Sequence, residues 1–187
     1  MKKFSKLELR KIWLMKAGYR LICLLGLNHQ KYIRKRNLFA LFGQKVLYQT
    51  HFLPNNPKRV KIHDNVCVAA NVVFYEHDVI NMVFERYDPS VKLHGHHTCI
   101  EIMDNCFIGG SSIIIGNVRI GPNAIVGGGS VVTKDVPPGT IVAGNPAKVI
   151  GSFYDLLKKR QTIDAECNGE NQLEKLWQSF YDKRSGC

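Results

Sequence analysis

No apolar stretch in this 187-residue chain is long enough to cross a membrane. The longest uncharged apolar run extends from Leu21 to Leu27, whereas a spanning helix needs about 20 such residues. Lys16 and Arg20 interrupt the apolar residues before it, and no small-residue cleavage site follows cleanly, which is unlike a signal peptide. We therefore expect neither a transmembrane segment nor a secretory leader.

The sequence also lacks the cysteine pattern of a disulfide scaffold or a zinc site. Its six cysteines have no regular spacing and form no CxxC pair, so we expect reduced thiols and a cytoplasmic protein, with Cys67 and Cys106 inside the repeats described below. Aromatic residues are sparsely interleaved with basic ones and no recognition motif is present. We therefore expect no nucleic-acid partner, although the net charge is +11.

The positive charge is concentrated in a basic arm, which we assign to residues 1–45. This arm holds twelve Lys or Arg and a single acid, Glu8, whereas residues 46–187 are balanced. Residues 5–27 are predicted to form a helix, and residues 37–43 a short helix that ends at Gly43. The arm either packs on the open end of the following domain or makes a peripheral contact with anionic lipid at the inner face of the membrane.

The central feature is a run of six six-residue blocks over residues 102–137. Every block opens with Ile or Val, carries Gly, Asp, Asn or Lys in its middle, and has a small or β-branched fifth residue. This period predicts a solenoid in which three blocks form one coil, the aliphatic residues point inward and the polar residues form the turns. We assign residues 46–151 to this all-β solenoid, with an irregular first coil and a clear coil over residues 62–78.

Two segments depart from the repeat. Residues 79–98 form a loop that contains His94, His96 and His97, and a loop of this length in a compact repeat is more often functional than accidental. Residues 152–187 are predicted to be helical. An apolar stripe with helical spacing within them is predicted to cover an exposed edge of the solenoid, and it comprises Leu173, Leu176, Trp177, Phe180 and Tyr181.

Three motifs give this sequence a family resemblance, and they are Asp104-Asn-Cys-Phe-Ile-Gly-Gly110, Gly121-Pro-Asn-Ala-Ile-Val-Gly-Gly-Gly-Ser-Val-Val-Thr-Lys-Asp135 and Ala143-Gly-Asn-Pro-Ala-Lys-Val149. Over residues 60–151 the chain resembles the hexapeptide-repeat acyltransferases, in particular the sugar O-acetyltransferases that include the maltose and galactoside enzymes. The resemblance implies a left-handed parallel β-helix, acetyl-CoA as co-substrate and a homotrimer with active sites between subunits.

The resemblance also points to a catalytic base. His77 interrupts the repeat where the long loop leaves, and its position matches the catalytic histidine of the family, one coil before Asp104. An imidazole suits this task because its pKa lies near neutrality. Either Glu76 or Asp78 would orient the ring, and His96 or His97 is the alternative base. We expect no metal at the loop histidines.

For acetyl-CoA, the resemblance implies a groove between neighbouring solenoids in which small residues let the ligand approach the main chain. The matching positions are Gly110, Gly128, Thr133 and Lys134, and Lys148 suits a CoA phosphate. Some sugar acetyltransferases have tryptophan where this chain has Phe107, and the first coil offers no clear match to the family's acceptor-side residues. The acceptor is therefore not predicted.

The leading hypothesis is an acetyl-CoA-dependent O-acetyltransferase that modifies a sugar or a surface-polysaccharide unit. N-acetylation of an amino sugar and acetylation of serine are alternatives within the same class. A catalytically silent solenoid that acts as a scaffold or a membrane-surface module is the alternative from another class.

Overall fold

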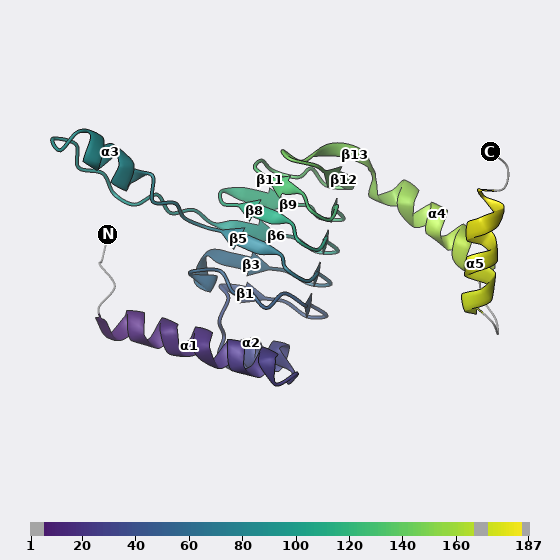
Figure 1. Cartoon of the computed structure of the whole chain (residues 1–187), viewed down its shortest axis with the longest axis horizontal. Helices are drawn as coiled ribbons and strands as arrows, with labels where there is room; N and C mark the ends of the chain where they lie inside the picture. The colour runs from purple at the N-terminus through teal and green to yellow at the C-terminus, as the bar shows by residue number, and fades with distance from the viewer. Residues whose placement is uncertain (1–5, 167–171, 185–187) are drawn as a thin grey trace.

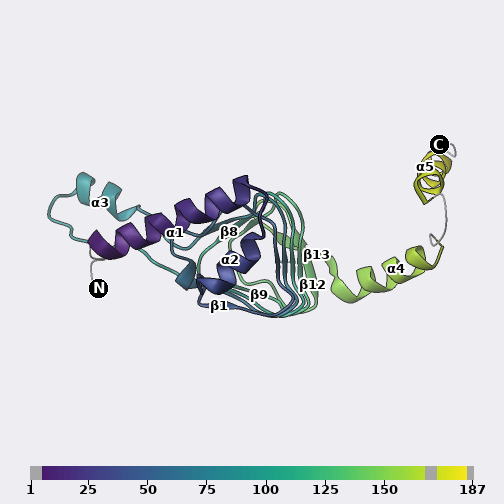
Figure 2. The same ribbon diagram turned by 90° about the horizontal axis from the view of Figure 1, so that it is seen from below.

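The computed structural model describes residues 6–166 and 172–184, and its centre is a stack of short strands in three sheets (Figures 1 and 2). The first sheet comprises β1 (Leu41–Phe42), β3 (Val60–Ile62), β6 (Ile100–Ile102) and β9 (Val118–Ile120). The second comprises β2 (Leu47–Tyr48), β4 (Cys67–Val68), β7 (Phe107–Ile108), β10 (Ile125–Val126), β12 (Thr140–Ala143) and β13 (Lys148–Ser152). The third comprises β5 (Val73–Tyr75), β8 (Ile113–Ile115) and β11 (Val131–Val132).

Successive coils stack in register. Ile102 in β6 pairs with Ile120 in β9, so one coil takes 18 residues, or three six-residue blocks. Ile62 pairs with Ile102 over 40 residues, so the long loop adds 22 residues to that coil. In the described part of the chain, all strand pairs are parallel except β12 with β13, the hairpin that ends the stack. The predicted stacking of parallel coils is therefore confirmed.

The interior is built from the first and fifth positions of the six blocks. The first-position side chains are at most 1 % exposed, and they are Ile102, Ile108, Ile114, Ile120, Val126 and Val132. The fifth-position side chains are also buried, and they are Cys106, Ser112, Val118, Ala124, Ser130 and Val136. The two serines satisfy their hydroxyls by donating to the carbonyl oxygen of Gly127, at 3.0 and 2.6 Å. The predicted inward register is thus confirmed.

Asparagines form the corner between the first and second sheets. Asn65, Asn105 and Asn123 have φ angles of 54°, 59° and 53°, a conformation that asparagine tolerates better than most residues. Their amides form a column: Asn65 donates to Asn105 at 2.8 Å, and Asn105 donates to Asn123 at 2.9 Å. Asn123 in turn donates to the hydroxyl of Tyr154 at 3.1 Å. The polar residues of the repeat therefore form the turns, as predicted.

Helices α1 (Lys6–Leu24) and α2 (His29–Lys35) lie across the open N-terminal end of the stack (Figures 1 and 2). Tyr19 of α1 is buried, and its hydroxyl donates to the carbonyl oxygen of Thr50 at 2.7 Å. The packing alternative for the basic arm is therefore correct for this helix. Trp13 and Leu24 stay exposed on its outer face, and contact of residues 1–45 with a membrane stays a prediction.

The predicted helix over residues 37–43 is wrong. Leu38 and Phe39 are buried, and the chain continues into β1, which pairs with β3 of the next coil. Gly43 does not end a helix: a Cβ there would lie 2.5 Å from the main-chain carbonyl carbon of His63, so glycine allows the coils to approach. The first strand thus begins at Leu41, inside the segment that we assigned to the arm.

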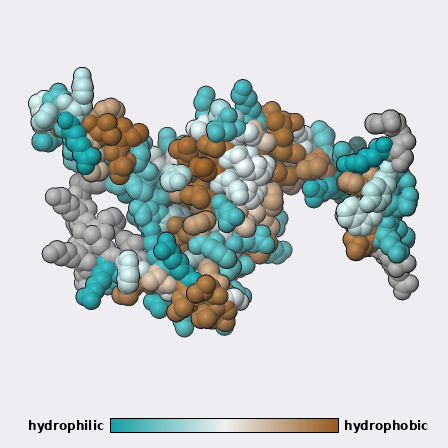
Figure 3. Space-filling view, in the orientation of Figure 1, coloured by the Kyte–Doolittle hydropathy of each residue, from teal (hydrophilic) through white to brown (hydrophobic). Residues whose placement is uncertain are grey.

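The remaining helices project from the stack. The loop carries α3 (Asn81–Tyr87) away from the coils, while α4 (Phe153–Glu166) and α5 (Gln172–Asp182) extend from the opposite side (Figure 1). A hydrophobic patch covers the part of the loop around α3 (Figure 3). A short 3₁₀ turn, η1 (Pro57–Arg59), precedes β3. Among the described residues, no helix has the length and apolar character that a membrane span requires.

The C-terminal stripe forms the predicted helix but does not cover the solenoid within one chain. Its apolar residues are exposed, and its three aromatic rings contact one another. The Trp177 ring lies 5.4 Å from that of Phe180 and stacks on that of Tyr181 at 5.9 Å. The predicted cover is therefore wrong, because the first turns of α4 carry the chain away from the coils (Figure 1).

Candidate active site

His77 lies where the third sheet ends and the long loop begins. It forms an isolated antiparallel bridge with His97, so the two strands of the loop meet at this corner. Its side chain is 28 % exposed. It faces a groove of about 460 Å³ whose lining comprises Tyr75, His77, Asp78, Val79, Ile80, His96, Thr98, Ile115 and Gly116. The structure therefore places the predicted base at an accessible groove.

The two ring nitrogens of His77 have different surroundings. Nε2 lies 3.3 Å from the side-chain amide nitrogen of Asn55. Nδ1 is buried and lies 3.6 Å from Oε1 of Glu76, which is longer than a hydrogen bond. Among the described residues, nothing forms a hydrogen bond with Nδ1 or with Oε2 of Glu76. A small ring rotation would let Nδ1–H donate to this carboxylate.

Glu76, rather than Asp78, is therefore the acid that faces the ring. Glu76 is 1 % exposed, and its Oε1 accepts a hydrogen bond of 2.5 Å from the main-chain N–H of Asn56. The Asp78 carboxylate instead accepts from the main-chain N–H of Ile80 at 3.0 Å, at the start of the loop. An imidazole with its proton on Nδ1, on the side of Glu76, keeps a lone pair on Nε2, which is the form that a general base needs. In this structure that lone pair faces the amide nitrogen of Asn55.

The loop histidines are dispersed. His97 lies beside His77, with the two ring centroids 6.2 Å apart. The pKa of His97 is lowered, mainly by desolvation and to a smaller extent by the charges of Arg59 and His77. His96 lines the groove, whereas His94 is exposed on the loop. Across residues 6–166 and 172–184, no three His, Cys, Asp or Glu side chains come together as a metal site.

The predicted CoA positions fall at two corners of the third sheet. Thr133 and Lys134 directly follow β11. Val132 of β11 pairs with Ile114 of β8, so the next residue, Thr133, is in register with Ile115. Ile115 in turn pairs with Tyr75, two residues before His77. Gly110 and Gly128 precede β8 and β11, at the other end of the same strands. The structure brings Thr133 and Lys134 toward His77 and does not bring the glycines there.

At the glycine corner, neighbouring coils approach each other closely. A Cβ at Gly110 would lie 3.2 Å from the carbonyl oxygen of Ala70, and one at Gly128 would lie 3.3 Å from that of Gly110. The N–H of Gly129 donates to the carbonyl oxygen of Gly110 at 2.9 Å, which ties the two coils together. Lys148 is exposed on β13 near this corner, since the adjacent Ala147 N–H donates to Val131 at 2.8 Å.

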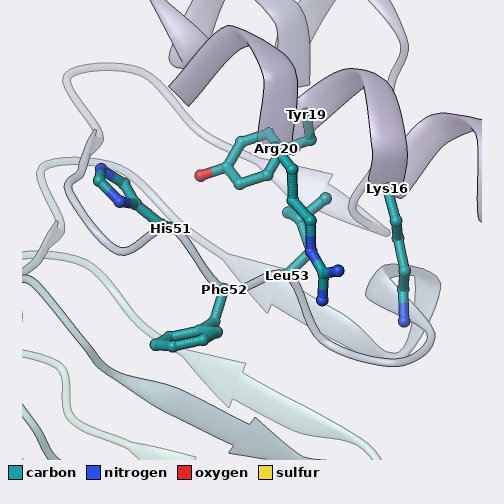
Figure 4. Close-up of a pocket in the computed structure, with 6 residues that line it drawn as sticks. All are labelled: Lys16, Tyr19, Arg20, His51, Phe52 and Leu53. Atoms are coloured by element: carbon teal, nitrogen blue, oxygen red, sulfur yellow. The ribbon is translucent and has the colours of Figure 1, made fainter. Parts of the chain in front are cut away.

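Sequence reasoning missed two residues at this site, Asn55 and Lys16. The Lys16 ammonium of α1 donates to the amide oxygen of Asn55 at 2.7 Å, and the amide nitrogen of Asn55 faces His77. Lys16 also lines a small cavity under α1, together with Arg20 (Figure 4). Both residues lie outside the clear repeats, in a helix and in a turn-rich segment, so no periodic signal marked them.

Comparison with known proteins supports this description. The sequence profile of the family "Bacterial transferase hexapeptide (six repeats)" matches residues 99–134. A putative acetyltransferase of Saccharomyces cerevisiae is 33 % identical over 68 % of this chain and 66 % of its own length. Galactoside O-acetyltransferase of Escherichia coli is 35 % identical over 64 % of this chain and 53 % of its own length.

Two solved structures share the fold. A maltose O-acetyltransferase from Clostridium difficile has a TM-score of 0.61 at 26 % identity and covers 79 % of this chain and 89 % of its own. A hexapeptide-repeat acetyltransferase of Vibrio cholerae complexed with acetyl-CoA has a TM-score of 0.57 at 23 % identity, with coverages of 82 % and 93 %. The chain spans less than two thirds of the length of the curated relatives named above.

The six buried block-opening residues, the stacked parallel coils and the matched profile agree with one another. The chain therefore belongs to the hexapeptide-repeat acyltransferase family.

Proposed function

We propose that the protein is an acetyl-CoA-dependent O-acetyltransferase that acts on a hydroxyl of a sugar or a surface-polysaccharide unit. Two of the proteins that it resembles are sugar O-acetyltransferases, and one structural neighbour binds acetyl-CoA. The observation that carries the proposal is the buried Nδ1 of His77 beside the Glu76 carboxylate, at the edge of a groove wide enough for a substrate.

His77 acts as the general base. Its Nε2 removes the proton from the acceptor hydroxyl while that oxygen attacks the thioester carbonyl, and the C–S bond then breaks. The same proton passes to the departing thiolate, so the products are an acetyl ester and free CoA. Glu76 accepts the hydrogen bond from Nδ1–H and stabilises the imidazolium as it forms, because a buried carboxylate is a strong acceptor. Glu76 is therefore a positioning residue.

We further propose a left-handed β-helix that assembles as a homotrimer. The CoA positions lie at two corners of one sheet, which favours a site shared between subunits. In this arrangement Gly110, Gly128 and Lys148 of one subunit hold CoA next to His77 of its neighbour. The glycines let the ligand approach the main chain, and Lys148 binds a phosphate as a point charge.

The test is acetyl-CoA consumption, measured as thiol release with a panel of sugars. We expect His77→Ala to lower kcat by about 10²–10⁴-fold, the usual contribution of general base catalysis. His94→Ala is the matched control, because His94 is an exposed loop histidine, and it should keep full activity. Including amino sugars and serine in the panel separates O- from N-acetylation. Binding of CoA without turnover of any acceptor would favour the scaffold instead.

A further inference from the structure

We propose that Lys16 and Arg20 of α1 form a subsite for a phosphate group carried by the acceptor. The proposal rests on the proposed acetyl transfer at His77 and narrows its substrate class to phosphorylated sugars, such as a sugar phosphate or a sugar linked through a diphosphate. Four features of the described residues support it: the fixed position of α1, the uncompensated charge, the cavity, and its connection to His77.

The segment of α1 that carries both cations is fixed on the solenoid. Tyr19 lies between them in sequence, is buried, and donates to the carbonyl oxygen of Thr50 at 2.7 Å. The hydroxyl of Tyr32 on α2 donates to the carbonyl oxygen of Met15 at 3.1 Å. Gly18 allows this close packing, since a Cβ there would lie 2.6 Å from the Tyr32 hydroxyl oxygen. The two cations therefore project from a rigid platform.

The charges of Lys16 and Arg20 are not balanced by a contacting acid. The two residues are four positions apart, so they lie on the same helix face. Among the described residues, no carboxylate lies within 4.0 Å of either one. Burial lowers the pKa of Lys16, Glu76 opposes this at longer range, and the charge of Arg20 lowers it further. An anion bound between the two cations would relieve their repulsion.

The cavity beside these cations matches a small anion. Its volume is about 60 Å³, whereas one water molecule needs at least about 10–15 Å³. It is lined by Lys16, Tyr19, Arg20, His51, Phe52 and Leu53. The Arg20 guanidinium extends from α1 beside Leu53, and Lys16 extends from the same helix on the side of Arg20 that faces away from Phe52 (Figure 4). The space holds a group of a few atoms rather than a sugar ring. Guanidinium and ammonium groups are the usual partners of phosphate oxygens.

The cavity is connected to the candidate base through one side chain. The amide oxygen of Asn55 accepts from Lys16 at 2.7 Å, and its amide nitrogen lies 3.3 Å from Nε2 of His77. The cation and the base therefore lie on opposite sides of a single amide group. A sugar whose phosphate is bound by Lys16 and Arg20 would have its hydroxyls within reach of His77.

The experiment compares two acceptors that differ only in the phosphate, a sugar 1-phosphate and its methyl glycoside. Lys16→Gln and Arg20→Gln should each raise KM for the phosphorylated acceptor by about 10-fold or more, the usual effect of losing a hydrogen bond to a charged group. KM of Arg20→Gln for the methyl glycoside should not change. Lys16 also donates to Asn55, so selectivity for the phosphorylated acceptor is judged on Arg20→Gln. Lys11→Gln is the matched control, because Lys11 is an exposed cation of the same helix.

Inorganic phosphate provides a readout that does not depend on turnover. Calorimetric titration should detect phosphate binding to the full chain and to Lys11→Gln, and no binding to Arg20→Gln. This result would support the subsite even if no acetyl transfer were found, so the two proposals can fail separately.

Four results would overturn the inference. Equal losses with both acceptors would mean that Lys16 acts only by positioning Asn55 and His77. A rise in KM for acetyl-CoA alone would assign the cations to CoA. Loss of binding to phosphatidylserine vesicles, with unchanged KM for the sugar phosphate, would assign them to a lipid surface. Phosphate binding that survives in Arg20→Gln would exclude this cavity as the anion site.

Discussion

Two adjacent isoleucines of β8 provide a sharp test of the inward register. Ile114 is fully buried between Phe74 and Val132 of the neighbouring coils, whereas Ile115 is 41 % exposed. Ile114→Ala removes three carbon atoms, which costs about 2.4 kcal/mol at about 0.8 kcal/mol per buried methylene. The cavity left behind raises the expected loss in unfolding free energy to about 3–4 kcal/mol, within the range seen for buried residues of this size.

Ile115→Ala is the matched control, because it removes the same atoms one residue away. It should lower the unfolding free energy by about 1.4 kcal/mol or less, because the side chain is already 41 % exposed and the transfer term scales with the buried fraction. The assay is urea unfolding followed by circular dichroism, at one protein concentration, since association affects apparent stability. Equal destabilisation by both substitutions, or a larger effect of Ile115→Ala, would refute the register, because a shift of one residue exchanges the two faces of a strand.

Two further predictions concern ionisation. Glu101 contacts His63, Arg119 and Lys61, and hydrogen bonds from the first two, with the charge of Arg119 and Lys61, hold its pKa below the usual 4.5. Glu101→Gln should therefore lower the unfolding free energy by about 0.5–1 kcal/mol at pH 7. The difference from the parent chain should shrink as the pH falls below 4.5 and through the lowered pKa. A difference that stays constant across this acid range would contradict the prediction. Burial raises the pKa of the Cys106 thiol to about 11, whereas Cys99 is exposed. At pH 8, iodoacetamide should alkylate Cys99 at least about 10²-fold faster than Cys106, as measured by peptide mass spectrometry, and comparable rates would show that Cys106 is accessible.

The regular part of the fold was predictable because the buried positions recur every six residues, the same period as the sequence repeat. Each block-opening residue is buried, and each corner asparagine adopts the left-handed conformation that the turn requires. Residues 37–43 were mispredicted as helical because β1 is only two residues long and carries no periodic signal. Its conformation is determined by pairing with β3 in the next coil, a contact that local propensity does not encode.

The candidate site was predictable to a different extent. His77 was found because the repeat breaks there and because the position matches a family motif. Asn55 and Lys16 could not be found in this way, since their contacts join residues 22 and 39 positions apart. These contacts depend on how α1 packs across the first coil. Similarly, the C-terminal stripe predicted its helix correctly, but periodicity does not say where a helix will lie.

The amide column along the corner of the coils has ends, and these ends limit growth of the stack. A solenoid with an open face can accept a coil from a second molecule, and repetition of that step would produce a filament. At the C-terminal end, the last amide, Asn123, already donates to Tyr154. At the other end, Lys45 occupies the corner position next to Asn65, and a lysine cannot extend an amide-to-amide chain. The asparagine column therefore ends at Tyr154 on one side and at the Lys45 corner on the other, so the column itself offers no continuous amide ladder to a further coil.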